Sequence, residues 1–221
     1  MKDRSRFLIV YNAVVFAAVL VAWTDMAFFS QEGMLSDLGL RNMKYFTVLS
    51  NVFEAIVSLA LAVCLARVRR GRAARVPHGV FLLKFLAAVT VAVTFLVVAL
   101  FFGLWVGYRP LYLGANFWFH LVVPVLAMAE FVLFDRFDAV TLRETAWAPL
   151  PALAYGAVYT VNVLVNGAGS DPDANDFYGF VHWGYPVGFG IFAGILFTSW
   201  AAGCLLRLGN RAGRKEKSID V

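Results

Sequence analysis

Residues 80–106 read VFLLKFLAAVTVAVTFLVVALFFGLWV and contain one charged side chain, Lys84. A helix needs about 20 apolar residues to cross the roughly 30 Å hydrocarbon core of a bilayer, so this stretch is long enough to span a membrane. The chain as a whole is 61% apolar and 15% charged, with a mean hydropathy of +0.74. This composition is unlike that of a soluble domain. Five more apolar stretches predict further spans near residues 7–28, 46–66, 116–134, 147–166 and 182–206. We therefore expect an all-α polytopic membrane protein with six transmembrane helices in one bundle.

The chain is expected to form a single domain over residues 1–221, because the connections are short and no linker or repeat divides it. The first stretch follows three basic residues, as in a signal peptide. It is longer than a typical signal-peptide core, and Trp23-Thr24-Asp25 does not resemble a small-residue cleavage site, so we interpret it as the first membrane helix. The longest connection, residues 167–179, is rich in turn residues and is predicted to be an outer flap between the fifth and sixth helices.

Basic residues gather at one side of the predicted helices. Sixteen of the 19 lysines and arginines lie at that side, counting Lys84, and only Arg41, Lys44 and Arg109 lie at the other. The positive-inside rule then places both termini in the cytoplasm. Five of these residues form a polybasic tail over residues 207–221. Solvent or anionic lipid headgroups would meet this tail, and we expect no nucleic-acid partner.

The sequence lacks the common motifs of soluble enzymes. It has no glycine-rich phosphate loop, no Gly-x-Ser-x-Gly turn and no His-Glu-x-x-His pair. Its two cysteines, Cys64 and Cys204, lie near inner helix ends and are not spaced as metal ligands. We expect neither a metal nor a cofactor, and the sequence leaves the oligomeric state open.

Four polar side chains interrupt the second apolar stretch. Thr47, Ser50, Asn51 and Glu54 follow one another at spacings of i, i+3, i+4 and i+7, which puts them on one face of a helix. Polar groups at membrane depth are costly when lipid surrounds them. This face is therefore predicted to point into the bundle or into a cavity.

The fourth stretch carries His120 and Glu130, which make it a second candidate for a functional helix. Pro124 lies four residues after the histidine and has no N–H for the His120 carbonyl, so we expect a free backbone acceptor and a kink there. The predicted topology puts Thr47, His120 and His182 at roughly one depth, in the outer leaflet.

Each of these residues also has a structural interpretation. A threonine in a membrane helix often bonds to the backbone of its own helix or joins two helices. A histidine can be a hydrogen-bonded packing residue, and His182 lies beside Trp183 where an interfacial residue is expected. Glu54 and Glu130 each need a partner or a proton inside the membrane. Position alone leaves these alternatives open.

Two segments resemble a known family. Tyr45-Phe46-Thr47-Val48-Leu49-Ser50-Asn51, and His120-Leu-Val-Val-Pro124 with Glu130 ten residues after the histidine, are similar to motifs of the FAR-17a/AIG1-like family and its bacterial Pr6Pr-type relatives. Residues 176–186 match the family's aromatic stretch before the last helix in part. Animal members are membrane threonine hydrolases that cleave fatty acid esters of hydroxy fatty acids. The resemblance implies Thr47 as nucleophile, His120 as base, a lipid ester as substrate and the bacterial inner membrane as location.

The implied chemistry is physically consistent. A threonine hydroxyl needs a base within hydrogen-bond reach, and a neutral histidine can accept its proton and return it to the leaving alcohol. Asn51 is the favoured oxyanion donor because its amide has two N–H groups, with Ser50 or a backbone N–H as alternatives. The remaining candidates for substrate binding near the outer helix ends are Tyr178, His182 and Trp118.

Other classes of function remain open at this stage. Glu54 and Glu130 could bind protons in a small proton-coupled transporter, or the bundle could bind lipids without catalysis. Haem ligation by His120 and His182 is a third possibility. The family resemblance favours a lipid-ester hydrolase among these classes.

Overall fold

The computed structural model describes residues 2–29, 32–34, 37–170 and 174–215. The predicted polybasic tail lies outside the described residues from residue 216 onward. The long helices are α1 (Lys2–Phe28), α2 (Phe46–Arg69), α3 (His78–Val97), α6 (Val123–Leu133), α7 (Leu150–Asn166) and α8 (Tyr185–Lys215). Shorter elements are the 3₁₀ turns η1 (Gly39–Lys44), η3 (Arg109–Leu111) and η5 (Glu144–Trp147), the helices α4 (Gly103–Val106) and α5 (Ala115–Phe117), and the π-helical turns η2 (Val98–Phe102) and η4 (Trp118–Val122).

The prediction of an all-α chain with six helices of membrane-spanning length is confirmed for the described residues. The spans are Arg4–Phe28, Phe46–Arg69, His78–Val106, Ala115–Leu133, Glu144–Asn166 and Tyr185–Gly213. The third joins α3, η2 and α4, and the fourth joins α5, η4 and α6. The sixth begins at Tyr185 rather than at residue 182, because Gly184 adopts a φ of 89°, which ends the preceding turn, and Pro186 suits a first helical turn.

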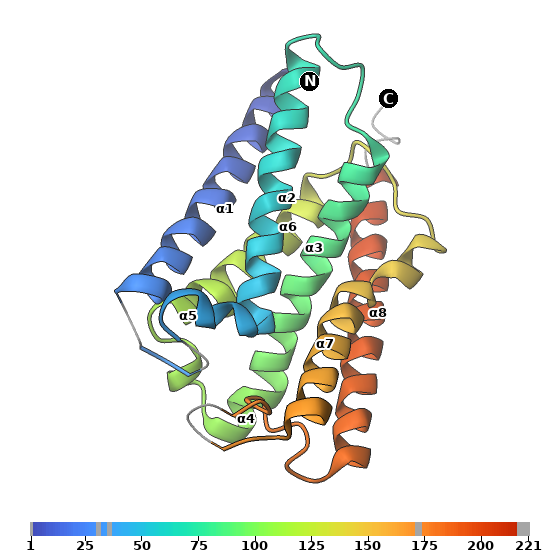
Figure 1. Ribbon diagram of the computed structural model, residues 1–221. Coiled ribbons are helices and arrows are strands. Elements are labelled where there is room, and N and C mark those ends of the chain that lie inside the picture. Colours follow the sequence, from blue (N-terminus) through green and yellow to red (C-terminus); the bar gives the residue numbers. More distant parts are fainter. Residues whose placement is uncertain (1, 30–31, 35–36, 171–173, 216–221) are drawn as a thin grey trace.

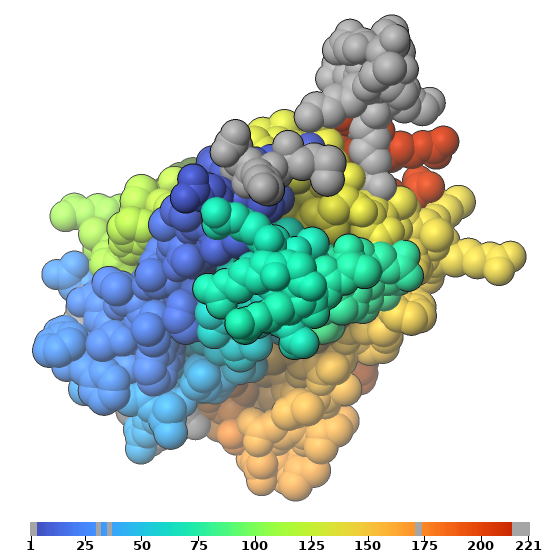
Figure 2. Space-filling view, turned by 90° about the horizontal axis from the view of Figure 1, so that it is seen from above, coloured from blue at the N-terminus to red at the C-terminus, as the bar shows by residue number. Residues whose placement is uncertain are grey.

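The spans form one bundle (Figure 1). We call the end that holds the start of α1, the connection between α2 and α3 and the end of α8 the amino end, and the opposite end the far end. Figure 2 looks onto the amino end, where the connection between α2 and α3 lies in front of the segment that follows α6. The first and last described residues are thus at one end, as an even number of spans requires.

Helix α3 lies at the centre of the bundle. In its most apolar window 61% of residues are buried, against 22% for α8, and it packs against α2, α6, α7 and α8. Its small residues Ala87, Ala88 and Ala92 let neighbouring backbones come close. The outer faces of α7 and α8 expose large apolar side chains such as Val158, Phe197 and Leu205, which are suited to contact with lipid tails.

Candidate functional site

The structure brings Thr47 and His120 into contact at the far end of the bundle. Thr47 lies in the first turn of α2 and His120 in the middle of η4. The two atoms Thr47 Oγ1 and His120 Nε2 are 3.3 Å apart, and both side chains are buried. The two residues that the sequence selected on separate helices therefore form one hydrogen-bonded pair.

A backbone carbonyl fixes the protonation pattern of His120. Nδ1 of this histidine lies 2.5 Å from the carbonyl oxygen of Leu111 in η3, which can only accept, so Nδ1 carries the ring hydrogen. In the neutral ring Nε2 then has a lone pair that faces the Thr47 hydroxyl. The Tyr112 ring packs edge-on against the imidazole and fixes its plane. The arrangement is that of a hydroxyl, a base and a group that orients the base.

The helix around His120 has a wider register than the sequence predicts. In η4 the Val123 N–H donates to the Trp118 carbonyl, five residues earlier. Because Pro124 has no N–H, it cannot donate to the Phe119 carbonyl, the next acceptor in this register. The expectation of a free His120 carbonyl stays a prediction. Asn51 Nδ2 donates to the Phe119 oxygen at 3.1 Å. The Phe119 carbonyl at this π turn therefore has a side-chain donor on α2.

Asn51 and Ser50 are engaged with the backbone around the pair. Asn51 Nδ2 also donates to the Thr47 carbonyl at 2.8 Å, so both of its N–H groups have acceptors. Ser50 Oγ donates to the same carbonyl at 2.9 Å and lies 3.0 Å from Thr94 Oγ1 of α3. Both side chains join α2 to its neighbours, and we assign them to positioning.

We expect Asn51→Leu to lower the stability of the fold. The change removes the side-chain donor of the buried Phe119 carbonyl, which costs about 1–3 kcal/mol, and with it one contact between η4 and α2. The Thr47 carbonyl keeps Ser50 Oγ as a donor. Thermal unfolding of the purified protein measures this effect, with Asn166→Leu, at an exposed position of α7, as the matched control. An unchanged unfolding temperature with lost turnover would instead assign Asn51 to oxyanion binding.

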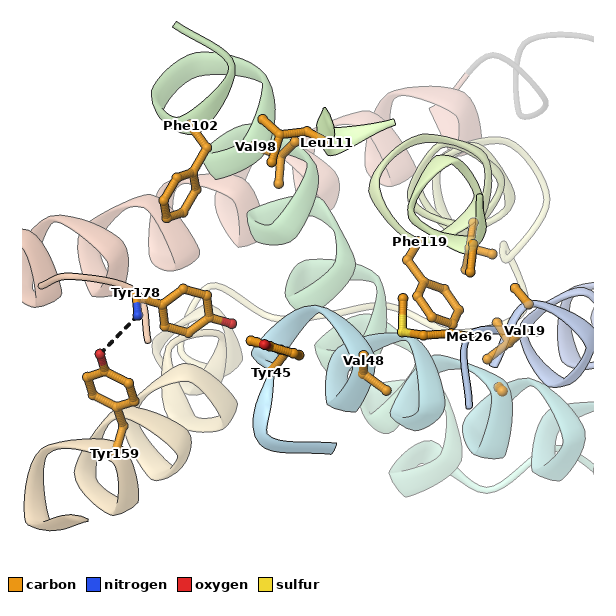
Figure 3. Packing of buried hydrophobic residues seen from close by; sticks show 14 of the residues in the cluster. Val19, Met26, Tyr45, Val48, Val98, Phe102, Leu111, Phe119, Tyr159 and Tyr178 are labelled. Atoms are coloured by element: carbon orange, nitrogen blue, oxygen red, sulfur yellow. Dashed lines mark hydrogen bonds between the residues drawn. The ribbon is translucent and has the colours of Figure 1, made fainter. Parts of the chain in front are cut away.

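Tyr178 connects the loop before α8 to the start of α2. Its hydroxyl oxygen accepts the Phe46 N–H at 2.8 Å, and its backbone N–H approaches the Tyr159 hydroxyl at 3.4 Å. Figure 3 shows this hydroxyl pointing toward the start of α2 beside Tyr45. Burial raises the pKa of Tyr178 to about 12, so the phenol keeps its proton at neutral pH. The predicted outer flap therefore inserts a buried side chain into the bundle.

An apolar cavity of about 90 Å³ adjoins Thr47. Its wall combines residues of α2, α3, α7 and α8 with the Tyr178 loop, and Thr47 and Tyr178 are among the hydroxyl side chains that line it. Its other lining residues include Val97, Phe102 and Phe192. A hydroxyl with a paired base at the wall of an apolar cavity can meet the carbonyl of a lipid.

Two sequence-predicted site residues lie elsewhere. His182 is exposed in the turn before α8, beside Trp183, and lines a separate depression of about 570 Å³. Trp118 is 42% exposed and packs against Phe117. Neither residue lines the cavity at Thr47.

The largest feature that sequence reasoning missed is a buried ion cluster nearer the amino end. Lys84 Nζ of α3 pairs with Glu130 of α6 at 2.8 Å and with Glu54 of α2, and it donates to Ser58 Oγ at 2.8 Å and to Asn12 Oδ1 of α1 at 3.3 Å. All five side chains are fully buried. The signal for this cluster was present, because Lys84 is the one charge in residues 80–106, but counting it as an inner-end residue concealed its role.

Six helices of spanning length, with exposed apolar faces and buried polar groups, define an integral membrane protein. In comparisons with known proteins, no protein-family model, curated protein or solved structure matches the chain. The function proposed below therefore depends on the geometry of the site.

Proposed function

We propose that this protein is an intramembrane lipid-ester hydrolase with Thr47 as nucleophile and His120 as base. The observation that carries this proposal is the distance of 3.3 Å between His120 Nε2 and the Oγ1 of Thr47, a residue that lines an apolar cavity. Substrates of the class implied by the family resemblance, fatty acid esters of hydroxy fatty acids or similar lipid esters, suit this setting.

The residues account for both halves of the reaction. His120 Nε2 takes the hydroxyl proton while Thr47 Oγ1 bonds to the ester carbonyl carbon and the carbonyl electron pair moves to oxygen. When the carbonyl re-forms, the bond to the alcohol oxygen breaks and His120 returns the proton to that oxygen. Water then attacks the acyl-threonine in the same way, which releases the fatty acid and restores Thr47.

Tyr178 and the start of α2 are the proposed oxyanion donors, in place of Asn51 and Ser50. The Tyr178 hydroxyl oxygen accepts a hydrogen bond from the Phe46 N–H, and Tyr178 lines the same cavity as Thr47. A protonated phenol and the N–H groups of a first helical turn both favour a developing negative charge. A substrate carbonyl oxygen placed there would meet donors that are held by the fold.

The acyl chain is proposed to enter sideways between α7 and α8. A volume of about 90 Å³ is far below that of a drug-sized ligand site, so only the part of a chain next to the ester fits inside. The rest would extend along the exposed apolar faces of these helices, where lipid tails lie. Water and product alcohol would use the depression that His182 lines, which shares Phe102, Tyr178 and Val181 with the cavity.

Gly156→Ala should impair the hydrolysis of long-chain esters more than that of short-chain esters. A Cβ at Gly156 of α7 would lie 1.9 Å from the Phe192 ring of α8, which lines the cavity, so this ring must move into the acyl path. Turnover measured against chain length tests this, with Gly190→Ala as the control because its Cβ would meet open space. An equal loss at every chain length would place the acyl chain elsewhere.

Hydrolysis by the detergent-purified protein tests the proposal itself. We expect release of both products from a fatty acid ester of a hydroxy fatty acid, and an acyl group on the peptide that contains Thr47 when a slow substrate is quenched with acid. A folded, monodisperse protein that hydrolyses none of a series of lipid esters contradicts the proposal.

The proposed location is a bacterial inner membrane with the amino end in the cytoplasm, following the positive-inside rule. The Thr47 site would then lie toward the outer leaflet. Bilayer lipids and the lipid substrate are the expected partners.

A proton-coupled carrier that uses Glu54 and Glu130 is the second candidate. The observation in its favour is that both carboxylates form ion pairs with the buried Lys84 ammonium group. A pH-driven flux in vesicles that Glu54→Gln removes and Thr47→Ala leaves intact would favour this carrier over the hydrolase.

A further inference from the structure

Asp135 extends the Lys84 cluster toward the amino end of the bundle. It follows the end of α6, two residues beyond Leu133, and its side chain is fully buried. Neither carboxylate oxygen has a hydrogen-bond partner among the described residues. A buried, ionised carboxylate without donors is costly, whereas a protonated one needs far less compensation.

The four charged groups with the largest influence on Asp135 do not balance its own charge. Glu54 from α2 and Glu130 from α6 add negative charge, while Lys84 from α3 and the Arg4 guanidinium from α1 add positive charge. With every acid ionised, three carboxylates would face two cations. One proton on one carboxyl group makes the set neutral.

The backbone around Asp135 adds no positive potential. Asp135 lies at the carboxyl end of α6, where the helix dipole is negative. Arg4 donates to the Phe134 carbonyl at 2.6 Å, and Asn210 of α8 donates to the carbonyls of Phe131 and Asp135 at 2.6 and 2.7 Å. Tyr11 of α1 also faces this carboxyl group, and its hydroxyl donates to the Leu126 carbonyl at 2.9 Å. These side chains donate to backbone carbonyls at the end of α6 and not to the Asp135 carboxyl group.

We propose that this cluster is a proton-binding site and that Asp135 holds its proton at neutral pH. Loss of the proton breaks the carboxyl O–H bond, leaves the electron pair on the carboxylate and passes H⁺ to water at the amino end. A metal ion is the weaker alternative, because the Lys84 ammonium already occupies the centre and no three potential metal ligands gather among the described residues. The proposal does not depend on ester hydrolysis.

The burial of Asp135, with Glu130 adding to it, raises the pKa of its carboxyl group well above the ordinary range. The folded protein then keeps a proton that the unfolded chain loses above about pH 4. Because the folded state binds more protons, its stability is full below that pH and falls as the pH rises toward the folded pKa. Asp135→Asn removes this dependence and mimics the protonated carboxyl in shape.

Infrared spectroscopy of the full-length protein in lipid nanodiscs tests the proposal. At neutral pH we expect a C=O band of a protonated carboxyl group that shifts in D₂O. The band should be absent in Asp135→Asn and retained in Asp138→Asn, a control at a partly exposed acid that pairs with His78. A parent protein without the band, or a band that persists in Asp135→Asn, overturns the assignment to Asp135.

Thermal unfolding gives an independent measurement on the parent protein. Its unfolding temperature should fall as the pH is raised from about 6 to about 9, and that of Asp135→Asn should fall less. Equal pH dependence in both proteins overturns the proposal, as does stabilisation of the parent by added Na⁺ or Mg²⁺ that Asp135→Asn abolishes, which would indicate a metal ion in place of the proton.

Discussion

Thr47→Ala should reduce ester turnover by about 10³-fold or more, since it removes the atom that forms the acyl intermediate. The cost to stability should be small. Thr47 Oγ1 makes one long hydrogen bond, to His120, and the loss of such a bond costs about 1 kcal/mol. Turnover and the thermal unfolding temperature, measured on the same preparation, separate the two effects.

Two variants complete this experiment. Thr47→Ser keeps a hydroxyl in reach of His120 and should retain measurable turnover. Thr198→Ala removes a threonine of α8 whose hydroxyl bonds only its own helix, to the Gly194 carbonyl, and should leave turnover unchanged. Full activity in Thr47→Ala would refute the threonine mechanism, whatever ester is used.

Lys84→Met should have the largest effect on stability. Methionine is close to lysine in length, but it leaves Glu54 and Glu130 buried without their shared cation. Breaking a buried ion pair by removal of one partner costs about 3–5 kcal/mol, because the remaining charge is uncompensated. We expect a marked fall in the thermal unfolding temperature and in the yield of folded protein.

The matched control is Lys44→Met. Lys44 pairs with Asp37 at 2.7 Å, and both side chains are about one-third exposed, so its loss should cost about 1 kcal/mol or less. Adding Glu54→Gln and Glu130→Gln to Lys84→Met should restore part of the stability, since neutral amides tolerate burial better than carboxylates. Equal effects of Lys84→Met and Lys44→Met would show that the buried cluster contributes little.

The candidate site could be predicted from the sequence in part. Thr47 and His120 were selected as polar residues at one membrane depth within two recognisable motifs, and the structure places them in contact. The roles of their neighbours could not be predicted. The bond from Asn51 to the Phe119 carbonyl accompanies a π register in η4, and no local pattern in the sequence predicted that register.

The ion cluster illustrates the limit more sharply. The sequence indicated that Glu54 and Glu130 each need a partner, but it did not show that Lys84 and Asn12, from two further helices, lie beside them. Their contacts depend on how far each helix is rotated about its axis. The position of Tyr178 was also not predictable, because the turn residues around it do not indicate that its side chain packs at the start of α2.

By itself the sequence determined the class of the protein and the approximate positions of its six spans. A bilayer offers the backbone no hydrogen-bond partners, so an apolar stretch of sufficient length must form a helix. Only the tertiary structure decided which polar side chains meet. Thr47 and His120 are 73 residues apart in the chain, and the fit of side chains between helices, which no local pattern encodes, brings them together.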